Sequence, residues 1–377
     1  MGIFFRKIDT AFRKKGATTY KIGFNMGDQL FAHSDNYTAF RNKPEEWGKF
    51  VKKFILEKKI DKIFLFGDCR YYQRIAREIA YKCNVDVYVF EEGYLRPDYI
   101  TLEKFGVNGF SKISRKVDFY KKLPADEAEK AQKAMQSKVK MVLSSSLYYG
   151  VSNIFYVKYP YYIHHRDFSA IKEFFYALRG VVGKVVYAFT EKKYTTLFTK
   201  TISKKYYFVP LQTHNDFQVL QHSNYRSIEK FIIEVLESFA HHAPKDTYLV
   251  FKHHPVDRGR KNYSFFIEEQ AELLGIRKRI YAVHDVHLPS CLKNSLGTVT
   301  INSTVGLSAI SYNIPTITLG DAIYDIKGLT NKGISLRKFW HQYKKPDAEL
   351  YNKFRQYLIQ TTQLNGSFYG RMPDELL

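Results

Sequence analysis

Cysteine is scarce in this sequence. Its 377 residues include three, Cys69, Cys83 and Cys291, which lie far apart and form no C-x-x-C pair. Such a set suggests neither a disulfide framework nor a zinc knuckle, and it is typical of a reducing, cytoplasmic compartment. The first sixteen residues are too broken by charge for a secretory signal, and no stretch of eighteen apolar residues occurs. We therefore expect a cytoplasmic chain that does not span a membrane.

Two common nucleotide-binding motifs are also missing. The sequence has no G-x-G-x-x-G and no P-loop. The ordinary dinucleotide-binding and NTPase hypotheses therefore lose their main support.

Acidic residues are in the minority. The sequence has 59 Lys and Arg against 37 Asp and Glu, a formal net charge of +22, which indicates a polyanionic partner such as nucleic acid, an anionic lipid surface or a phosphorylated substrate. Residues 111–210 hold 19 of the basic residues and 7 of the acidic ones, together with many Tyr and Phe. Basic residues interleaved with aromatic ones can stack on bases or lie at a lipid headgroup boundary. The uncharged, mildly apolar stretch Met141–Val157 favours lipid, and ordinary helices with a solvated basic face are the alternative.

Strand-like and helix-like segments alternate on both sides of this basic segment. The strand patterns lie at 20–24, 62–67 and 85–90 before it, and at 204–211, 247–252, 279–283, 297–302 and 315–320 after it. Amphipathic helical patterns separate them, the clearest over 227–240. Strands that alternate with helices of this length predict an α/β fold with parallel, doubly wound sheets. Two Rossmann-like domains facing one another would bind a ligand in a cleft at the carboxyl ends of their strands.

Domain boundaries are expected near residues 200 and 335. The first domain would cover 1–200 and include the basic aromatic segment, at about 111–200, as a helical insertion close to a membrane. The second domain would cover 201–335. A helical tail over 336–377 would pack back on the first domain.

Three polar clusters fall at predicted strand ends. The first, in "VYVFEEGYLRP", contains Glu91, Glu92 and Gly93. A glycine lets the chain turn sharply, and a carboxylate just before it is well placed for a general acid or base. Adjacent side chains point to opposite sides of an extended chain, so we expect one carboxylate to face the ligand and favour Glu92. A solvated turn in which Arg96 is a local ion-pair partner is the alternative.

The second cluster is "KHHPVDRG", which begins with Lys252, His253, His254 and Pro255. An imidazole donates well to a phosphate oxygen, and proline fixes the backbone beyond it. The two histidines should alternate sides, so that one faces the ligand, and Lys252 adds positive charge. Metal binding, with the later "HDVH" as a source of extra ligands, is a competing idea that lacks a convincing carboxylate or cysteine complement.

The third cluster is "INSTVG", which places Asn302, Ser303 and Thr304 between a strand and a helical pattern. Small hydroxylated residues at a helix start bring side-chain donors and backbone N–H groups to one point, which suits an anion. Simple N-capping by Ser303 or Thr304 is the alternative, and the two functions are compatible.

The motifs "EEG", "HP" and the Ser/Thr pair of "NST", in this order, resemble those shared by bacterial transferases that use CMP-activated acidic sugars. The segments "FVPLQTHNDFQVLQHS", "FKHHPVDRG" and "NSTVGLSAISYNIPTITLGDAIYDIKGLT" resemble more narrowly the capsule polysaccharide biosynthesis and export family, with its retaining β-Kdo transferases of the KpsS and KpsC type. The resemblance spans roughly residues 20–335. The chain has room for one transferase module, as in the KpsS type.

This resemblance implies a GT-B-like fold and a specific reaction. A protein of the single-module type takes Kdo from CMP-β-Kdo and places the first β-Kdo on a phosphatidylglycerol or lysophosphatidylglycerol terminus, where the poly-Kdo linker of a capsular polysaccharide starts. Motif by motif, the resemblance implies cytidine monophosphate binding by His254 and Pro255, phosphate or Kdo-carboxylate contacts from Ser303 and Thr304, and an acid/base role for Glu92. The other residues expected at the CMP-Kdo site are Gln212, His214, Lys252 and Asn302.

The implied chemistry also needs a nucleophile. Retention at an anomeric carbon that bears a carboxylate, beside a deoxygenated C3, suggests double displacement through a covalent glycosyl-enzyme. Asp216 in "LQTHNDFQV" is the candidate, and its position matches that of the nucleophile in related β-Kdo transferases. A helix or turn cap before "FQVLQHS" is the alternative role for this residue.

No cofactor is clearly required besides the donor substrate. No Asp lies two positions from another Asp, so the Asp-x-Asp pair by which many GT-A transferases hold a metal diphosphate is absent. CMP leaves with one phosphate, which positive side chains and helix N-termini can neutralise. We therefore name no metal ligand.

An anionic phospholipid acceptor would account for the basic aromatic segment. The protein would then work as a peripheral protein at the inner face of the cytoplasmic membrane, with other capsule proteins as further partners and without nucleic acid. Asn25 and Asp28 in "GFNMGDQLF", together with Arg96, are expected on the acceptor side.

Other functions stay open at this stage. A transferase of the same family could extend a Kdo chain already begun or use another CMP-linked sugar. A non-catalytic adaptor for capsule export and a nucleic-acid-binding protein belong to different classes, and neither explains three polar clusters at three strand ends.

Overall fold

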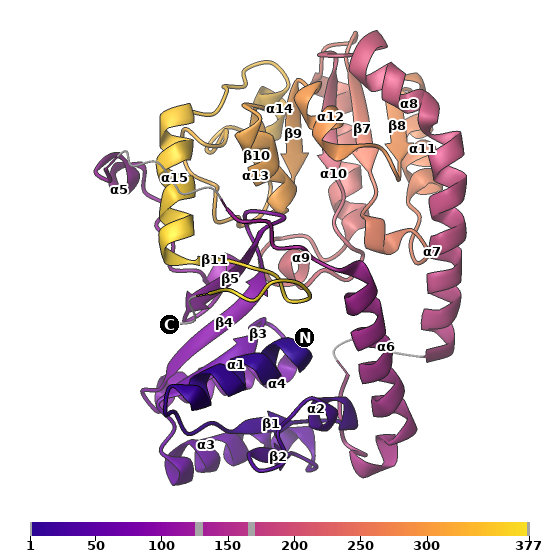
Figure 1. The fold of residues 1–377 in the computed structure, drawn as a ribbon. Coiled ribbons are helices and arrows are strands. Elements are labelled where there is room, and N and C mark those ends of the chain that lie inside the picture. The colour runs from indigo at the N-terminus through magenta and orange to yellow at the C-terminus, as the bar shows by residue number, and fades with distance from the viewer. Residues whose placement is uncertain (1, 125–130, 165–169, 375–377) are drawn as a thin grey trace. The chain divides into compact units, whose positions relative to one another are not determined.

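The computed structural model describes residues 2–124, 131–164 and 170–374. Within them the chain forms two compact units, each with its own sheet (Figure 1). The first unit comprises Met1–Val107, Ala128–Glu173 and Ile359–Leu377, and the second comprises Asn108–Glu127 and Phe174–Leu358. This division differs from the expected boundaries, since residues 108–127, 174–200 and 336–358 belong to the second unit.

The second unit is built on a five-stranded parallel sheet. Its strands lie in the order β10–β9–β6–β7–β8, with bounds β6 (Tyr206–Pro210), β7 (Tyr248–Lys252), β8 (Ile280–Val283), β9 (Gly297–Thr300) and β10 (Thr316–Thr318). Numbered by their sequence within the unit, the strands therefore run 3-2-1-4-5, which is the Rossmann order. The predicted α/β class and the parallel sheet are confirmed for this half of the chain.

Helices cover both faces of this sheet. Along β6 the side chains alternate, so that Tyr207 and Val209 pack on one face while Tyr206 and Phe208 pack on the other. The first face carries α10 (Ile228–His242), α11 (Ser264–Leu273) and α14 (Leu336–Phe339), and the second carries α12 (Leu288–Lys293) and α13 (Thr304–Ser311). The helix predicted over 227–240 is α10. Ser227 caps it by accepting a hydrogen bond from the Lys230 N–H at 3.4 Å.

The first unit has a mixed sheet, and here the prediction of a wholly parallel sheet is wrong. The strands lie in the order β11–β5–β4–β3, with bounds β3 (Lys62–Phe66), β4 (Asp86–Glu92), β5 (Tyr99–Lys104) and β11 (Gln363–Asn365). Strands β3 and β4 are parallel, whereas β5 is antiparallel to both β4 and β11. Only residues 93–98 join β4 to β5. So short a connection cannot supply the crossover that a parallel pair needs.

The first unit also packs helices on both faces of its sheet. Helices α3 (Trp47–Lys58) and α4 (Tyr71–Lys82) cover one face, and α1 (Gly2–Lys14) covers the other with Phe4 and Ile8. The strand predicted at 20–24 is β1 (Lys21–Gly23), which pairs with β2 (Tyr37–Ala39) in a separate two-stranded sheet.

The basic aromatic segment is helical, as predicted. It contains α5 (Val117–Lys121), α6 (Lys138–Ile154), α7 (Ala170–Thr190) and α8 (Lys192–Thr196). In the first unit α6 packs against the short helix α2 (Met26–Leu30). The C-terminal helix α15 (Ala348–Thr361) packs on α5 in the second unit through Phe354 and Tyr120, whose ring centroids are 5.4 Å apart. No helix in the described parts of the chain is long and apolar enough to cross a membrane.

Candidate functional site

The strand order of the second unit marks a point where polar residues meet. The central strand β6 has β9 on one side and β7 on the other, and the connections reverse direction between β6 and β9. In doubly wound sheets, ligands bind outside the carboxyl ends of the strands at this switch point. The segments that leave these strands are 211–216, 253–260 and 301–304, which contain the predicted donor-site residues.

Gln212, Asp216 and Asn302 form one hydrogen-bonded set at the switch point. The Gln212 amide nitrogen donates to Asp216 Oδ2 at 3.1 Å and to Asn302 Oδ1 at 3.0 Å, and its oxygen accepts from the Asn302 N–H at 3.3 Å. Gln212 is buried, so it is held firmly between the two loops. The structure thus brings together the predicted nucleophile and two predicted donor-site residues that lie up to ninety positions apart in the sequence.

Asp216 also has the structural role that the sequence left open. It is the N-cap of α9 (Phe217–Gln221), where its Oδ1 accepts a hydrogen bond from the Gln218 N–H at 2.9 Å. The other carboxylate oxygen accepts from Gln212. Both contacts fix the carboxylate in one orientation at the edge of the sheet, and capping does not exclude a chemical role.

The two adjacent histidines lie in different environments. His253 is buried, donates its Nδ1–H to the Val283 carbonyl at 3.0 Å and accepts the Tyr263 N–H on Nε2 at 2.9 Å. Its ring stacks on His284 at 3.9 Å. Because both ring nitrogens have backbone partners, His253 offers no lone pair to a metal ion, which weakens the competing metal hypothesis. In the described residues, no cluster of three or more His, Cys, Asp or Glu side chains is arranged to hold a metal.

His254 is the histidine at the surface of the site. It is half-buried, and its Nδ1 accepts the Val256 N–H at 3.2 Å, so the neutral ring carries its proton on Nε2. Pro255 opens the 3₁₀ turn Pro255–Asp257 directly after it. Of the two histidines, His254 stays the predicted ligand-facing one.

Burial lowers the pKa of His253 to about 3, because the charged ring would lose its water shell and would lie beside His284. An unfolded histidine titrates near 6.5, so between about pH 6.5 and 3 the unfolded chain binds a proton that the folded chain does not. We therefore expect the free energy of unfolding to fall by about 1.4 kcal/mol per pH unit as the pH drops through this range. His253→Gln should be less stable than the native chain at pH 7.5 but lose less stability between pH 6.5 and 5. Urea unfolding at several pH values tests this, and equal slopes for both proteins would contradict it.

Lys252 lies deeper than the sequence suggested. Its ammonium group is buried and donates to the carbonyls of His253 at 3.3 Å and of His284 at 3.2 Å. Burial lowers its pKa, while the nearby Asp285 opposes this shift. Lys252 therefore supports the strand ends of β7 and β8 from within.

A residue that the sequence analysis missed, Asp257, holds His214. Asp257 is 1% exposed, and its carboxylate accepts both the backbone N–H of His214 at 2.8 Å and a hydrogen bond from the ring Nδ1 at 2.8 Å. The His214 side chain is 34% exposed, and its other ring nitrogen is not engaged by Asp257. The pair ties the loop after β6 to the loop after β7. The sequence feature that could have indicated this role is the carboxylate of Asp257, three positions after His254.

If the site binds CMP, as the family resemblance implies, Asp257→Asn should weaken that binding about tenfold, which is the effect of one lost hydrogen bond to a charged group. The substituted amide cannot accept from both the backbone N–H and the ring of His214, so the ring loses its fixed orientation and tautomer. Calorimetric titration with CMP measures the effect, and His214→Gln should give a loss of similar size. If Asp257 only stabilised the fold, Asp257→Asn would lower the melting temperature and leave the dissociation constant for CMP unchanged.

Ser303 caps α13 and presents the helix start at the switch point. Its Oγ accepts the Val305 N–H at 3.2 Å, and its carbonyl accepts a hydrogen bond from the buried Tyr324 hydroxyl. Gly306 permits this contact, because a Cβ at that position would lie 2.3 Å from the Tyr324 hydroxyl. Thr304 is the first residue of the helix. The predicted capping is confirmed, and the helix N-terminus offers partial positive charge to an anion.

Glu91 and Glu92 lie at the end of β4, in the first unit. Val89 and Phe90, which precede them, face opposite sides of the sheet, so the two carboxylates also alternate. Burial raises the pKa of Glu91 to about 7, and the neighbouring carboxylates of Glu92 and Asp68 contribute. A carboxyl group with such a pKa is half-protonated near neutral pH and suits acid/base catalysis. The sequence favoured Glu92 and did not single out Glu91.

Arg96 and the acceptor-side candidates have partners inside the first unit. Arg96 Nε donates to the Gly93 carbonyl at 3.2 Å, which stabilises the turn after β4. The Asn25 amide donates to the Tyr148 hydroxyl at 2.8 Å, and that hydroxyl donates to Asp28 at 3.0 Å. Asn25 and Asp28 thus attach α6 to α2, a structural role that the sequence did not predict.

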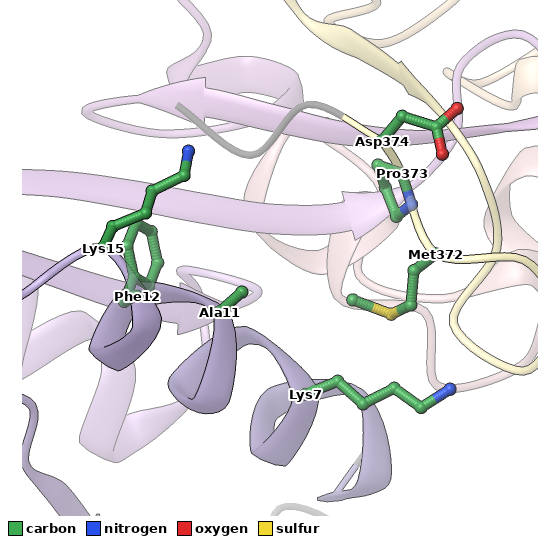
Figure 2. Close-up of a pocket in the computed structure, with 7 residues that line it drawn as sticks. All are labelled: Lys7, Ala11, Phe12, Lys15, Met372, Pro373 and Asp374. Atoms are coloured by element: carbon green, nitrogen blue, oxygen red, sulfur yellow. The ribbon is translucent and has the colours of Figure 1, made fainter.

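A surface hollow of about 200 Å³ lies elsewhere in the first unit (Figure 2). Figure 2 shows that α1 forms one wall and the C-terminal segment the other, with these lining residues: Lys7, Ala11, Phe12, Lys15, Met372, Pro373 and Asp374. It shares no residue with the predicted site.

Residues 61–369 match the family described as "Capsule polysaccharide biosynthesis protein", and the chain belongs to this family. The predicted family is thereby confirmed. The capsule polysaccharide export protein KpsS of Escherichia coli is 37% identical over 369 residues, which cover 98% of this chain and 95% of that protein. The capsule polysaccharide modification protein LipB of Neisseria meningitidis serogroup A is 38% identical over 389 residues, which cover 99% of this chain and 90% of that protein. A solved structure of Thermosulfurimonas dismutans KpsC, beta Kdo 2,7 transferase, aligns with a TM-score of 0.47 at 15% identity, over 95% of this chain and 96% of that one.

Proposed function

We propose that this chain is a retaining β-Kdo transferase. It moves Kdo from CMP-β-Kdo to a phosphatidylglycerol or lysophosphatidylglycerol terminus and so starts the poly-Kdo linker of a capsular polysaccharide. The observation that carries the proposal is the hydrogen-bonded set of Gln212, Asp216 and Asn302 at the switch point of a Rossmann-type sheet, in a chain of the capsule family. Its relatives KpsS and LipB are named as capsule export and modification proteins, which agrees with a step in capsule assembly.

The donor phosphate has three groups of partners in this proposal. His254 donates from Nε2, His214 contributes the ring nitrogen that Asp257 does not hold, and the start of α13 offers N–H groups beside Ser303. Together they neutralise the single phosphate of CMP without needing a metal ion. Buried Lys252 adds positive charge from behind the strand ends.

The bond changes follow a double displacement. A carboxylate oxygen of Asp216 attacks the anomeric carbon of Kdo, the bond from that carbon to the phosphate oxygen breaks, and CMP leaves with the electron pair. The acceptor hydroxyl then attacks the same carbon, loses its proton to a base, and the ester bond to Asp216 breaks. We assign the base to Glu92, with Glu91 as the alternative that its pKa of about 7 favours. Two inversions give net retention.

The proposed acceptor is an anionic phospholipid. A phospholipid acceptor implies work at the inner face of the cytoplasmic membrane, beside other capsule proteins. The excess of Lys and Arg within residues 111–210 supports an anionic surface as partner.

Purified protein incubated with CMP-Kdo and alternative acceptors tests the function. We expect Kdo transfer to lysophosphatidylglycerol and no transfer to an acceptor that already ends in Kdo. Transfer to the Kdo-primed acceptor alone would identify a chain-extending enzyme instead. An absence of CMP release with every acceptor would favour a non-catalytic adaptor.

A further inference from the structure

Helix α7 touches the second unit along one narrow stripe. A Cβ at Gly259 would lie 2.0 Å from the Tyr176 carbonyl oxygen and 2.8 Å from the Gly180 nitrogen, so the loop after β7 lies directly on the helix backbone. Two turns beyond Gly180, the Tyr187 ring stacks on His284 at 3.9 Å. Because Tyr176, Gly180 and Tyr187 are spaced by four and seven positions, which bring residues to the same side of a helix, a single side of α7 is docked.

Just beyond α7, Glu191 locks the end of the helix. Its buried carboxylate accepts the N–H groups of His284 at 2.9 Å and of Asp285 at 2.7 Å. Burial opposes ionisation of Glu191, but these donors together lower its pKa, so it stays charged. The position of α7 on the unit is therefore well defined.

The opposite side of α7 is apolar and exposed. At 100° per residue, its large apolar side chains lie on the side away from the docked stripe. Eight of them are between 46% and 78% exposed: Phe174, Phe175, Leu178, Val181, Val182, Val185, Val186 and Phe189. A row of this length is unusual on a water-exposed surface and marks an interaction site.

The charges around this apolar face indicate what covers it. Arg179 lies along one edge of the face and Lys184 along the other, and Lys192 and Lys193 follow the helix. Glu173 is the one acidic residue in the α7 sequence, and it lies on the same edge as Lys184, three turns earlier. Phenylalanines stand near both ends, with mainly aliphatic residues between them. Apolar, cation-rimmed helices of this kind lie in the plane of an anionic bilayer.

We infer that α7 inserts its apolar face into the headgroup and acyl boundary of an anionic bilayer and holds the second unit on that surface. Because one side of the helix is docked along its length and the apolar side is opposite, the helix axis lies in the plane of the bilayer. The inference deepens the proposed function, on which it rests for the identity of the lipid, by naming the element that contacts the membrane.

Flotation with vesicles of phosphatidylglycerol and phosphatidylethanolamine, compared with vesicles of phosphatidylcholine, tests this inference. We expect binding to the anionic vesicles, and a loss of at least about tenfold in Val182→Glu/Val185→Glu. The matched control is Phe265→Glu/Leu273→Glu on α11, whose side chains are 78% and 77% exposed, and it should bind like the native chain. Arg179→Gln/Lys184→Gln should bind anionic vesicles about fivefold more weakly for each removed charge, and its binding to phosphatidylcholine vesicles should not change.

Two results would overturn the inference. One is unchanged vesicle binding by the double glutamate variant. The other is a native dimer in vesicle-free buffer that the same variant dissociates, which would show that a second copy covers the face. Transfer to a soluble, short-chain lysophosphatidylglycerol without vesicles should be equal in all variants. If the native chain binds vesicles but transfers no Kdo to the soluble lysophosphatidylglycerol, the proposed function would be wrong and the inference about α7 would stand.

Discussion

Asp216→Asn should abolish Kdo transfer while the protein stays folded. Asparagine is as good an N-cap as aspartate, so the cap of α9 is kept, but the amide is not a nucleophile. The variant loses one favourable contact with Gln212, at a cost of about 1 kcal/mol in folding stability. We expect the rate of transfer to fall at least about thousandfold, because the first bond-forming step is removed.

Mass spectrometry of the intact protein after mixing with CMP-Kdo provides the direct measurement. The native chain should carry a covalent Kdo adduct that is absent from Asp216→Asn. Asp216→Ala, which loses the cap as well, separates the two roles of the residue. If Asp216 were only a helix cap, Asp216→Asn would keep nearly full activity and Asp216→Ala would be the damaged variant.

Glu92→Gln should lower the transfer rate at least about hundredfold, the usual contribution of a general base. Because glutamine has the shape of glutamate without its charge, the fold should persist. The pH dependence of the rate, measured in Glu92→Gln and in Glu91→Gln, decides between the two carboxylates. If a group that titrates near pH 7 disappears from the profile only in Glu91→Gln, the acid/base role belongs to Glu91.

Glu91→Gln has a separate effect on stability that follows from its raised pKa. The folded chain keeps the Glu91 proton up to about pH 7, whereas an unfolded glutamate loses it near 4.5. Stability therefore falls as the pH rises from 4.5 to 7, and the loss persists above 7. At pH 8, Glu91→Gln should be more stable than the native chain by up to about 3 kcal/mol, and near pH 4.5 the difference should largely vanish. Chemical unfolding at both pH values measures it.

The second sheet was predictable because its pattern is local. Each strand is a short apolar run and each connecting helix shows a clear apolar face, as in α10, so the alternation alone predicts parallel pairing. The antiparallel β5 was not predictable in the same way, since its pairing with β4 depends on the length of a turn. Helix α1 was missed because its buried residues, Phe4 and Ile8, are separated by charged ones.

The sequence predicted which polar residues follow the strand ends, but not which residues they bond with. That Asp216, His254 and Ser303 follow strands of one sheet can be read from the sequence. That Asp257 holds His214, 43 positions away, depends on the order of those strands in space. His253 differs from His254 because its ring bonds with the carbonyl of Val283 and the N–H of Tyr263, and these two groups are brought to it by the fold.

The close contact between Gly259 and α7 has a consequence for the length of the product. Gly259 lies five positions after His254 in one loop, so a helix held in the bilayer would set the height of the donor phosphate above the lipid surface. An acceptor hydroxyl on the lipid headgroup itself, as in the proposed function, fits that fixed height. Once a residue has been added, the new terminus stands further from the bilayer and no longer reaches the donor. Under the proposed function, Gly259 and α7 would then act as a ruler that stops the enzyme after a short addition.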